Sequence, residues 1–165
     1  MRLRHVLRHL SAPSWLLRRA LGPAELDALT ASIAASERRH RGEICVAVDS
    51  TLPWSALRRD LDSRQRAEAL FQQYGVDQTR EATGILIYVQ LLDRRLEILA
   101  DRGIAACVAQ AEWDAICRAV ATEFAAGRYA NGLHLAVDRA TALLAQHFPA
   151  GDDNPDELAN RPRVR

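Results

Sequence analysis

GILIYVQLLDRRLEILA, the stretch from Gly84 to Ala100, consists of two apolar runs separated by a short polar turn. The first run is rich in Ile, Val and Tyr, and the second partly alternates apolar with charged side chains, which is typical of strands. Asp93 suits a tight connection between them. We therefore predict an antiparallel hairpin with strands near residues 84–91 and 94–100.

Outward from the hairpin, other segments show equally regular patterns. The run Glu43–Asp49 is apolar at nearly every position, which predicts a buried strand of a sheet that is covered on both faces. Apolar residues recur at helical spacing in four segments, at about 23–40, 61–74, 109–126 and 131–147. Residues 50–60, between the strand 43–49 and the helix 61–74, are expected to form a loop. This order predicts an α/β fold, a small mixed β-sheet of three to four strands flanked by helices in an αβα sandwich.

The length of 165 residues suits one domain with a sizeable core. We expect a basic N-terminal helical segment over residues 1–22, a folded domain over 23–149, and a charged, loosely held C-terminal tail over 150–165. No internal repeat divides the sequence.

Composition excludes several function classes. The formal charge of +1 opposes a dedicated nucleic-acid binder, so nucleic acid is not an expected partner. Every basic residue other than histidine is arginine, which excludes a Schiff-base lysine and a phosphate-loop lysine, and no glycine-rich phosphate loop occurs. The three cysteines, Cys45, Cys107 and Cys117, are widely spaced and fit a reduced, cytoplasmic setting.

The N-terminal region is basic. Residues 1–41 contain eight arginines against three acidic residues, an excess of five positive charges. A helical stripe of apolar residues is formed by Leu3, Val6, Leu7 and Leu10. We favour a first helix packed on the domain, with contact to a membrane surface or a membrane protein as the alternative, which corresponds to a peripheral location at the inner membrane. His5 and His9 are interpreted as solvated helix residues rather than metal ligands.

Acidic residues stand where the predicted strands begin and end. Asp49 and Asp101 end the first and third strands, and Asp77 and Glu81 precede the second. We expect Asp49 and Asp101 to face the same edge of the sheet as Asp77 and Glu81. Ligands of covered α/β sheets gather outside strand ends, and carboxylates in loops suit Ca²⁺. We predict that at least two of these four residues bind one divalent cation; the alternative is that they cap helices and form turns. Asp93 ranks below them because we expect the hairpin tip to lie at the other end of the sheet.

Short local patterns recur in a fixed order along the chain. They are GEI at 42–44, TGILIYV at 83–89, DRR at 93–95, ADRGI at 100–104, WD at 113–114, FAAGRYANGL at 124–133, HFP at 147–149 and DELAN at 156–160. In this order they resemble the TPM domain family, and the last two resemble a bacterial subgroup of stand-alone, non-secreted members. The resemblance covers about 23–160. The sequence departs from it at Thr83, where the family has Asn, and at Ala100, where the family has Gly.

The resemblance implies an αβα sandwich. Some members of the family resemble calcium binders, and the family carries a phosphatase label. It therefore implies a module that binds a divalent cation such as Ca²⁺. A metal-dependent phosphatase acting on phosphomonoesters, and a protein-interaction module at the cytoplasmic membrane surface, remain alternatives. Catalytic residues are not identified, although Arg80 and Arg102 are candidates for holding an oxyanion.

Overall fold

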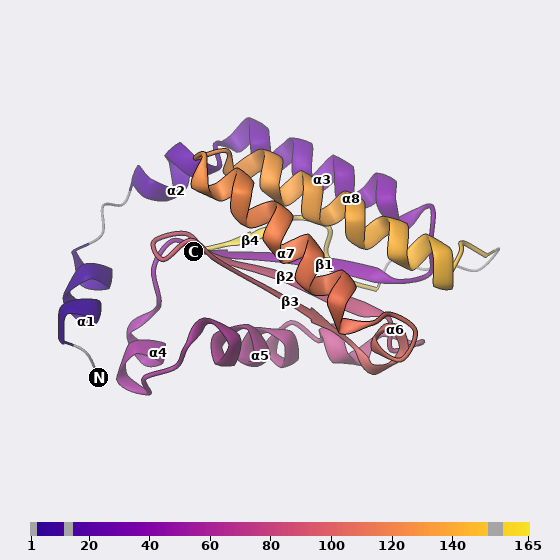
Figure 1. Cartoon of the computed structure of the whole chain (residues 1–165), viewed down its shortest axis with the longest axis horizontal. Coiled ribbons are helices and arrows are strands. Elements are labelled where there is room, and N and C mark those ends of the chain that lie inside the picture. Colours follow the sequence, from indigo (N-terminus) through magenta and orange to yellow (C-terminus); the bar gives the residue numbers. More distant parts are fainter. Residues whose placement is uncertain (1–2, 12–14, 152–156) are drawn as a thin grey trace.

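The chain forms a four-stranded mixed sheet between two layers of helices, as the computed structural model shows for residues 3–11, 15–151 and 157–165 (Figure 1). The strands lie in the order β3-β2-β1-β4. Their bounds are β1 Glu43–Asp49, β2 Gly84–Gln90, β3 Arg95–Ala100 and β4 Arg163–Val164. The predicted αβα sandwich is confirmed, and the three strands predicted from the sequence lie within one residue of their expected bounds.

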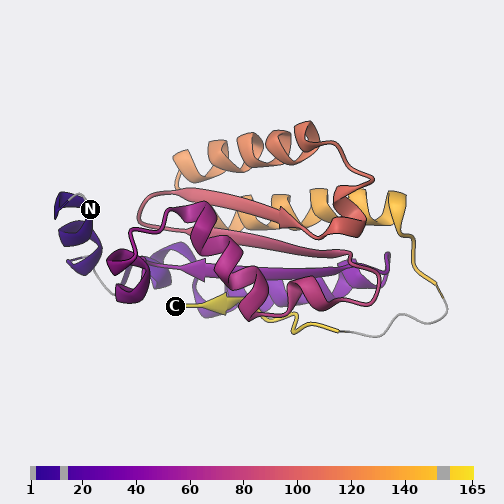
Figure 2. The same ribbon diagram turned by 90° about the horizontal axis from the view of Figure 1, so that it is seen from below.

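Helices cover both faces of this sheet. On one face lie α3 Pro23–Glu37, α7 Gln110–Ala125 and α8 Tyr129–His147, and the other face is crossed by α5 Ser63–Gln73 (Figures 1 and 2). The shorter helices are α1 Leu3–Leu10, α2 Trp15–Ala20, α4 Trp54–Arg58 and α6 Arg102–Ala105, with a 3₁₀ turn, η1, at Val76–Gln78. In Figure 1, α1, α2 and α4 all lie at one end of the molecule, away from α6.

The strand register separates two ends of the sheet. β1 and β2 are parallel, with Asp49 opposite Gln90, whereas β2 and β3 are antiparallel, with Ile85 opposite Ala100. The hairpin-turn end is where β1 and β2 finish and the β2–β3 turn lies. The strand-start end is where β1 and β2 begin and β3 finishes.

The core has two parts because both faces of the sheet are covered. Every residue of β1 and β2 is buried, as the nearly continuous apolar runs predict. Alternate side chains, such as Val46 and Ile87, join the large cluster beneath α3, α7 and α8. Their neighbours in sequence, such as Ala47 and Leu86, join a smaller cluster beneath α5.

Two helices differ from the prediction. The expected loop 50–60 contains α4, whose Ala56 and Leu57 are buried in a small cluster with Val6 of α1. A helix of five residues is too short to produce a readable periodicity. The last helix begins at Tyr129, two residues before its expected start at 131, so Asn131 lies within the helix and is not its cap.

The C-terminal tail was expected to be loosely held, and for its last residues this is wrong. β4 pairs in parallel with β1, and the Arg165 N–H donates to the carbonyl of Val48 at 2.9 Å. The guanidinium of Arg163 lies 4.4 Å from the ring centre of Tyr74. Strand pairing and a cation–π contact therefore hold the end of the tail, although its charged composition predicted that it would be loosely held. Residues 152–156 lie outside the described residues.

Candidate functional site

A polar cavity of about 850 Å³ opens at the hairpin-turn end. It lies where the segment before α5, the first turn of α5, the β2–β3 hairpin and α1 meet. Its lining residues are Arg8, Leu52, Asp60, Leu61, Asp62, Ser63, Arg64, Gln90, Asp93, Arg95 and Glu97. Four of these are acidic and three are arginines, so the cavity presents charges of both signs. It lies outside the carboxyl ends of the parallel strands, where α/β sheets commonly bind ligands.

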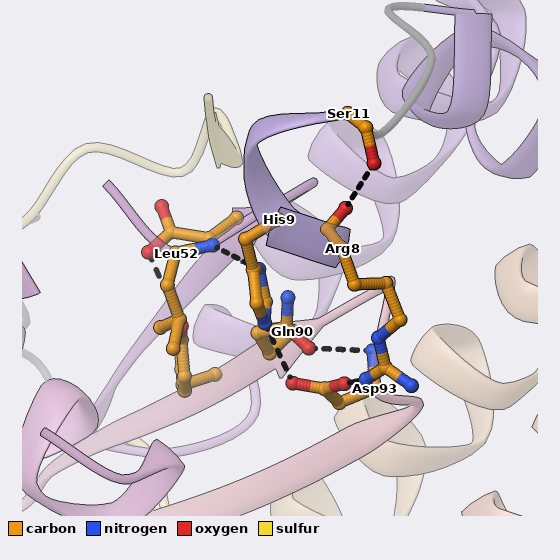
Figure 3. A network of polar contacts seen from close by, with 8 residues as sticks. Arg8, His9, Ser11, Leu52, Gln90 and Asp93 are labelled. Atoms are coloured by element: carbon orange, nitrogen blue, oxygen red, sulfur yellow. Dashed lines mark hydrogen bonds and ion pairs between the residues drawn. The ribbon is translucent and has the colours of Figure 1, made fainter. Parts of the chain in front are cut away.

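Asp93 links the hairpin tip to the N-terminal helix. Its carboxylate forms an ion pair with Arg8 and accepts a hydrogen bond from Nε2 of His9 at 3.0 Å (Figure 3). Its backbone N–H donates to Oε1 of the buried Gln90 at 2.6 Å. Two consecutive residues of α1 thus hold one wall of the cavity.

His9 is buried, so the expectation of a solvated histidine is wrong. Its Nδ1 accepts a hydrogen bond from the backbone N–H of Leu52 at 3.0 Å. Because Nδ1 is the acceptor, Nε2 carries the proton that is donated to Asp93. No local pattern in the sequence indicates this contact, because His9 and Asp93 are 84 residues apart.

The first turn of α5 forms another wall. Asp62 caps the helix in a reciprocal arrangement with Gln65, in which each side chain accepts a hydrogen bond from the other residue's backbone N–H. The hydroxyl of Ser63 donates to a carboxylate oxygen of Glu97 in β3 at 2.5 Å. A hydrogen bond between two lining residues therefore joins the start of the helix to the strand.

Asp49 also lies at the hairpin-turn end, but its carboxylate is buried and accepts hydrogen bonds from other buried side chains. Oδ2 accepts hydrogen bonds from Nε of Arg66 at 2.8 Å and from the hydroxyl of Tyr88 at 3.1 Å. Burial, and then the neighbouring Asp49 carboxylate, raise the pKa of Tyr88. Burial opposes the charge on Arg66, but the hydrogen bond and charge of Asp49 outweigh it and raise its pKa.

The other three predicted cation ligands lie at the strand-start end. Asp77 is exposed in η1, and Glu81 pairs with the guanidinium of Arg41 at 2.7 Å. Asp101 caps α6 by accepting from the Arg102 N–H at 2.7 Å. The expectation that Asp49 and Asp101 share one edge is wrong, because the antiparallel hairpin places the end of β3 beside the start of β2.

The described residues contain no preformed metal centre. Across 3–11, 15–151 and 157–165, no three His, Cys, Asp or Glu side chains are gathered so that they could hold an ion. In the same part of the chain, no helix is both long and apolar enough to cross a bilayer.

The fold and cavity define a small αβα-sandwich protein with a polar pocket beyond the ends of its parallel strands. The chain belongs to the TPM domain family, which matches residues 18–143 and confirms the resemblance in the sequence. The chain is also similar to the NMR structure of BA42 protein from the psychrophilic bacterium Bizionia argentinensis, with 30% identity and a TM-score of 0.78. That similarity covers 88% of this chain and 95% of the other. No curated protein matches the sequence.

Proposed function

We propose that this TPM domain is a ligand-binding module that takes a divalent cation such as Ca²⁺ in the cavity at the hairpin-turn end. The observation that carries the proposal is the chemistry of the lining, in which Asp60, Asp62, Asp93 and Glu97 supply carboxylate oxygens around one opening. Oxygen ligands of this kind suit Ca²⁺, which tolerates irregular geometry. Of the four ligands predicted from the sequence, Asp77, Glu81 and Asp101 lie at the strand-start end, so the proposed site is at the opposite end of the sheet from these three.

Binding at this cavity involves competition with groups of the protein itself. Arg8 and His9 hold the carboxylate of Asp93, and Ser63 holds that of Glu97. A cation has to replace these contacts before it gains several carboxylate ligands. We therefore expect weak affinity, with a dissociation constant on the order of 10⁻⁴ to 10⁻³ M, at the weak end of the range for protein calcium sites.

Calcium titration with two matched variants tests both the binding and its place. Isothermal calorimetry measures the affinity, and NMR shifts of the backbone amides map it. We expect shifts in the segments 60–64 and 90–97, and a rise in melting temperature by mass action. Asp93→Asn should weaken both effects, whereas Asp101→Asn, at the strand-start end, should leave them unchanged.

Two results would contradict the proposal. Shifts confined to 76–83 and to Asp101 would place the cation at the strand-start end, where three of the four residues predicted from the sequence lie. An absence of heat and shifts at millimolar Ca²⁺ removes cation binding altogether. A mutant that melts at the wild-type temperature without Ca²⁺ shows that a lost response is not a loss of folding.

Hydrolysis of phosphomonoesters is the second candidate, and one observation favours it. Gln90 is buried and lines the cavity, and its Nε2 finds no hydrogen-bond partner among the described residues. An orphaned buried N–H group needs an acceptor, such as a phosphate oxygen. The guanidinium groups of Arg64 and Arg95 line the same cavity and suit phosphate.

Hydrolysis of p-nitrophenyl phosphate, with and without a chelator, tests this candidate. In that reaction a water oxygen bonds to phosphorus as the bond to nitrophenolate breaks, and the water proton goes to solvent. A divalent cation supplies charge stabilisation and activation of water in such reactions. We expect activity that is lost on chelation and falls in Arg95→Gln but not in Arg118→Gln on α7. Activity that persists after chelation contradicts the metal-dependent reaction.

A further inference from the structure

The N-terminal helix α1 packs on the domain with an unusual choice of buried and exposed side chains. Val6 and His9 are buried, whereas Leu7 and Leu10 are 54% and 61% exposed. A helix that packs on a soluble domain normally turns its leucines inward and its polar residues outward. Here a histidine is buried, and two leucines, one helical turn apart, face solvent.

The other exposed large apolar residues lie in neighbouring helices. Among the described residues, these are Trp15 of α2 and Trp54 of α4, each 53% exposed. α4 packs against α1 through the cluster that contains Val6 and Leu57. Figure 1 shows α1, α2 and α4 together at one end of the molecule. The exposed large apolar side chains are therefore concentrated at that end; we call Leu7, Leu10, Trp15 and Trp54 the apolar end patch.

The charged side chains of α1 and α2 are all positive. The sequences of α1, LRHVLRHL, and α2, WLLRRA, contain four arginines and no acidic residue. Arg18 and Arg19 are exposed, and the guanidinium of Arg19 lies 5.6 Å from the ring centre of Trp15. The guanidinium of Arg19 thus lies directly beside the exposed tryptophan. In α4, Arg58 is exposed as well.

We propose that the apolar end patch docks on the surface of an anionic lipid bilayer. Leucine and tryptophan side chains enter the boundary between headgroups and acyl chains, and the exposed Arg18, Arg19 and Arg58 pair with anionic headgroups. Trp15 suits this boundary because its ring is apolar and its N–H is polar. The positive charge argues for a lipid surface over an uncharged apolar partner, since anionic headgroups complement it.

Vesicle pelleting of the full chain tests the proposal with paired variants. We expect pelleting with vesicles of phosphatidylglycerol and phosphatidylcholine, little with phosphatidylcholine alone, and weakening on addition of salt. Leu7→Ser/Leu10→Ser should abolish pelleting. Arg18→Ser/Arg19→Ser should weaken partitioning by about tenfold or more. Arg118→Ser/Arg139→Ser, on α7 and α8, removes the same charge elsewhere and should have no such effect.

Tryptophan fluorescence gives a second readout of the same contact. Trp113 is 4% exposed, so only Trp15 and Trp54 can change environment on docking. Anionic vesicles should shift the emission to shorter wavelength, and Trp15→Phe should reduce that shift. Melting curves in the absence of lipid establish that each variant is folded.

Three results overturn the proposal. One is no pelleting with anionic vesicles. Another is an equal loss of pelleting in the Arg118→Ser/Arg139→Ser control, which shows a response to net charge alone. The last is a dimer in sedimentation velocity, lost in Leu7→Ser/Leu10→Ser and accompanied by no vesicle binding, which assigns the patch to a second copy of the chain.

Discussion

Oδ2 of Asp49 lies 2.8 Å from Nε of Arg66, and this contact joins the end of β1 to α5 on one face of the sheet. Both side chains are almost fully buried, and Tyr88 adds a further hydrogen bond to the same oxygen. Buried ion pairs add little net stability, but the loss of one partner leaves the other charge without compensation. The contact therefore makes Asp49 a structural residue of the core.

Removal of the Asp49 charge should destabilise the fold. We expect Asp49→Asn to lower the free energy of unfolding by about 3 kcal/mol, because Arg66 remains charged and buried. Urea denaturation measures the change. Asp77→Asn, at an exposed position, is the matched control and should change it by less than about 0.5 kcal/mol. In the double variant with Arg66→Gln, losses that simply add would contradict the coupling.

His40 should make stability depend on pH. Burial lowers its pKa to about 4, although Nδ1 donates a hydrogen bond to the carbonyl of Gly42 at 3.0 Å. In the unfolded chain the value is about 6.5, so between these two values the unfolded state binds the additional proton. Stability therefore rises with pH in this window, and from pH 7.5 down to 5.0 this residue removes about 2 kcal/mol.

Urea denaturation at several pH values in wild type and His40→Gln isolates this contribution. The variant should lose less stability than wild type on acidification, although it starts from a lower value because a buried histidine has been replaced. Parallel pH profiles for the two proteins would show that other groups cause the dependence.

The three cysteines should differ in reactivity. Cys107 is exposed, Cys45 is buried, and the pKa of Cys117 is raised to about 11 by burial and then by the charge of Glu97. Thiolate is the reactive form, so we expect one rapidly labelled thiol in the native protein and three after denaturation. Absorbance with a disulfide reagent counts them. Cys107→Ser should remove the rapid phase; its persistence would contradict this assignment.

Gly84 should tolerate no side chain. A Cβ at this position would lie 2.1 Å from the carbonyl oxygen of Val76, which is backbone and cannot move aside alone. We expect Gly84→Ala to cost about 3 kcal/mol of stability, at the upper end of overpacking. At Gly151 the nearest atom, on Arg41, lies 3.5 Å away, so Gly151→Ala is the matched control and should be nearly neutral. Equal melting temperatures for the two variants would contradict the contact.

The elements that could be predicted are those with a local pattern. The run 43–49 and the hairpin 84–100 repeat apolar residues over enough positions to specify a strand, and they form in the structure as predicted. β4 contains two residues, and its pairing depends on β1, far away in the sequence. No local pattern could have shown it.

The end of the sheet at which each acidic residue lies depends on strand direction, and a local sequence pattern does not give strand direction. The predicted hairpin already implied that Asp101, after β3, lies beside the start of β2. What was missing was that β1 runs parallel to β2, which places Asp49 at the opposite end. Arg8 and His9 meet Asp93 only through the tertiary fold, so the composition of α1 could not identify them as part of a cavity wall.

The position of β1 between β2 and β4 has a consequence for the order of folding events. The β2–β3 hairpin joins neighbours in sequence and can form early, whereas Glu43 pairs with Gly84 and Ala47 with Arg163 only after long loops close. We expect docking of β1 to limit the folding rate. Until it docks, the apolar edge of β2 is available to other chains, so aggregation during refolding should increase with protein concentration and originate at this edge.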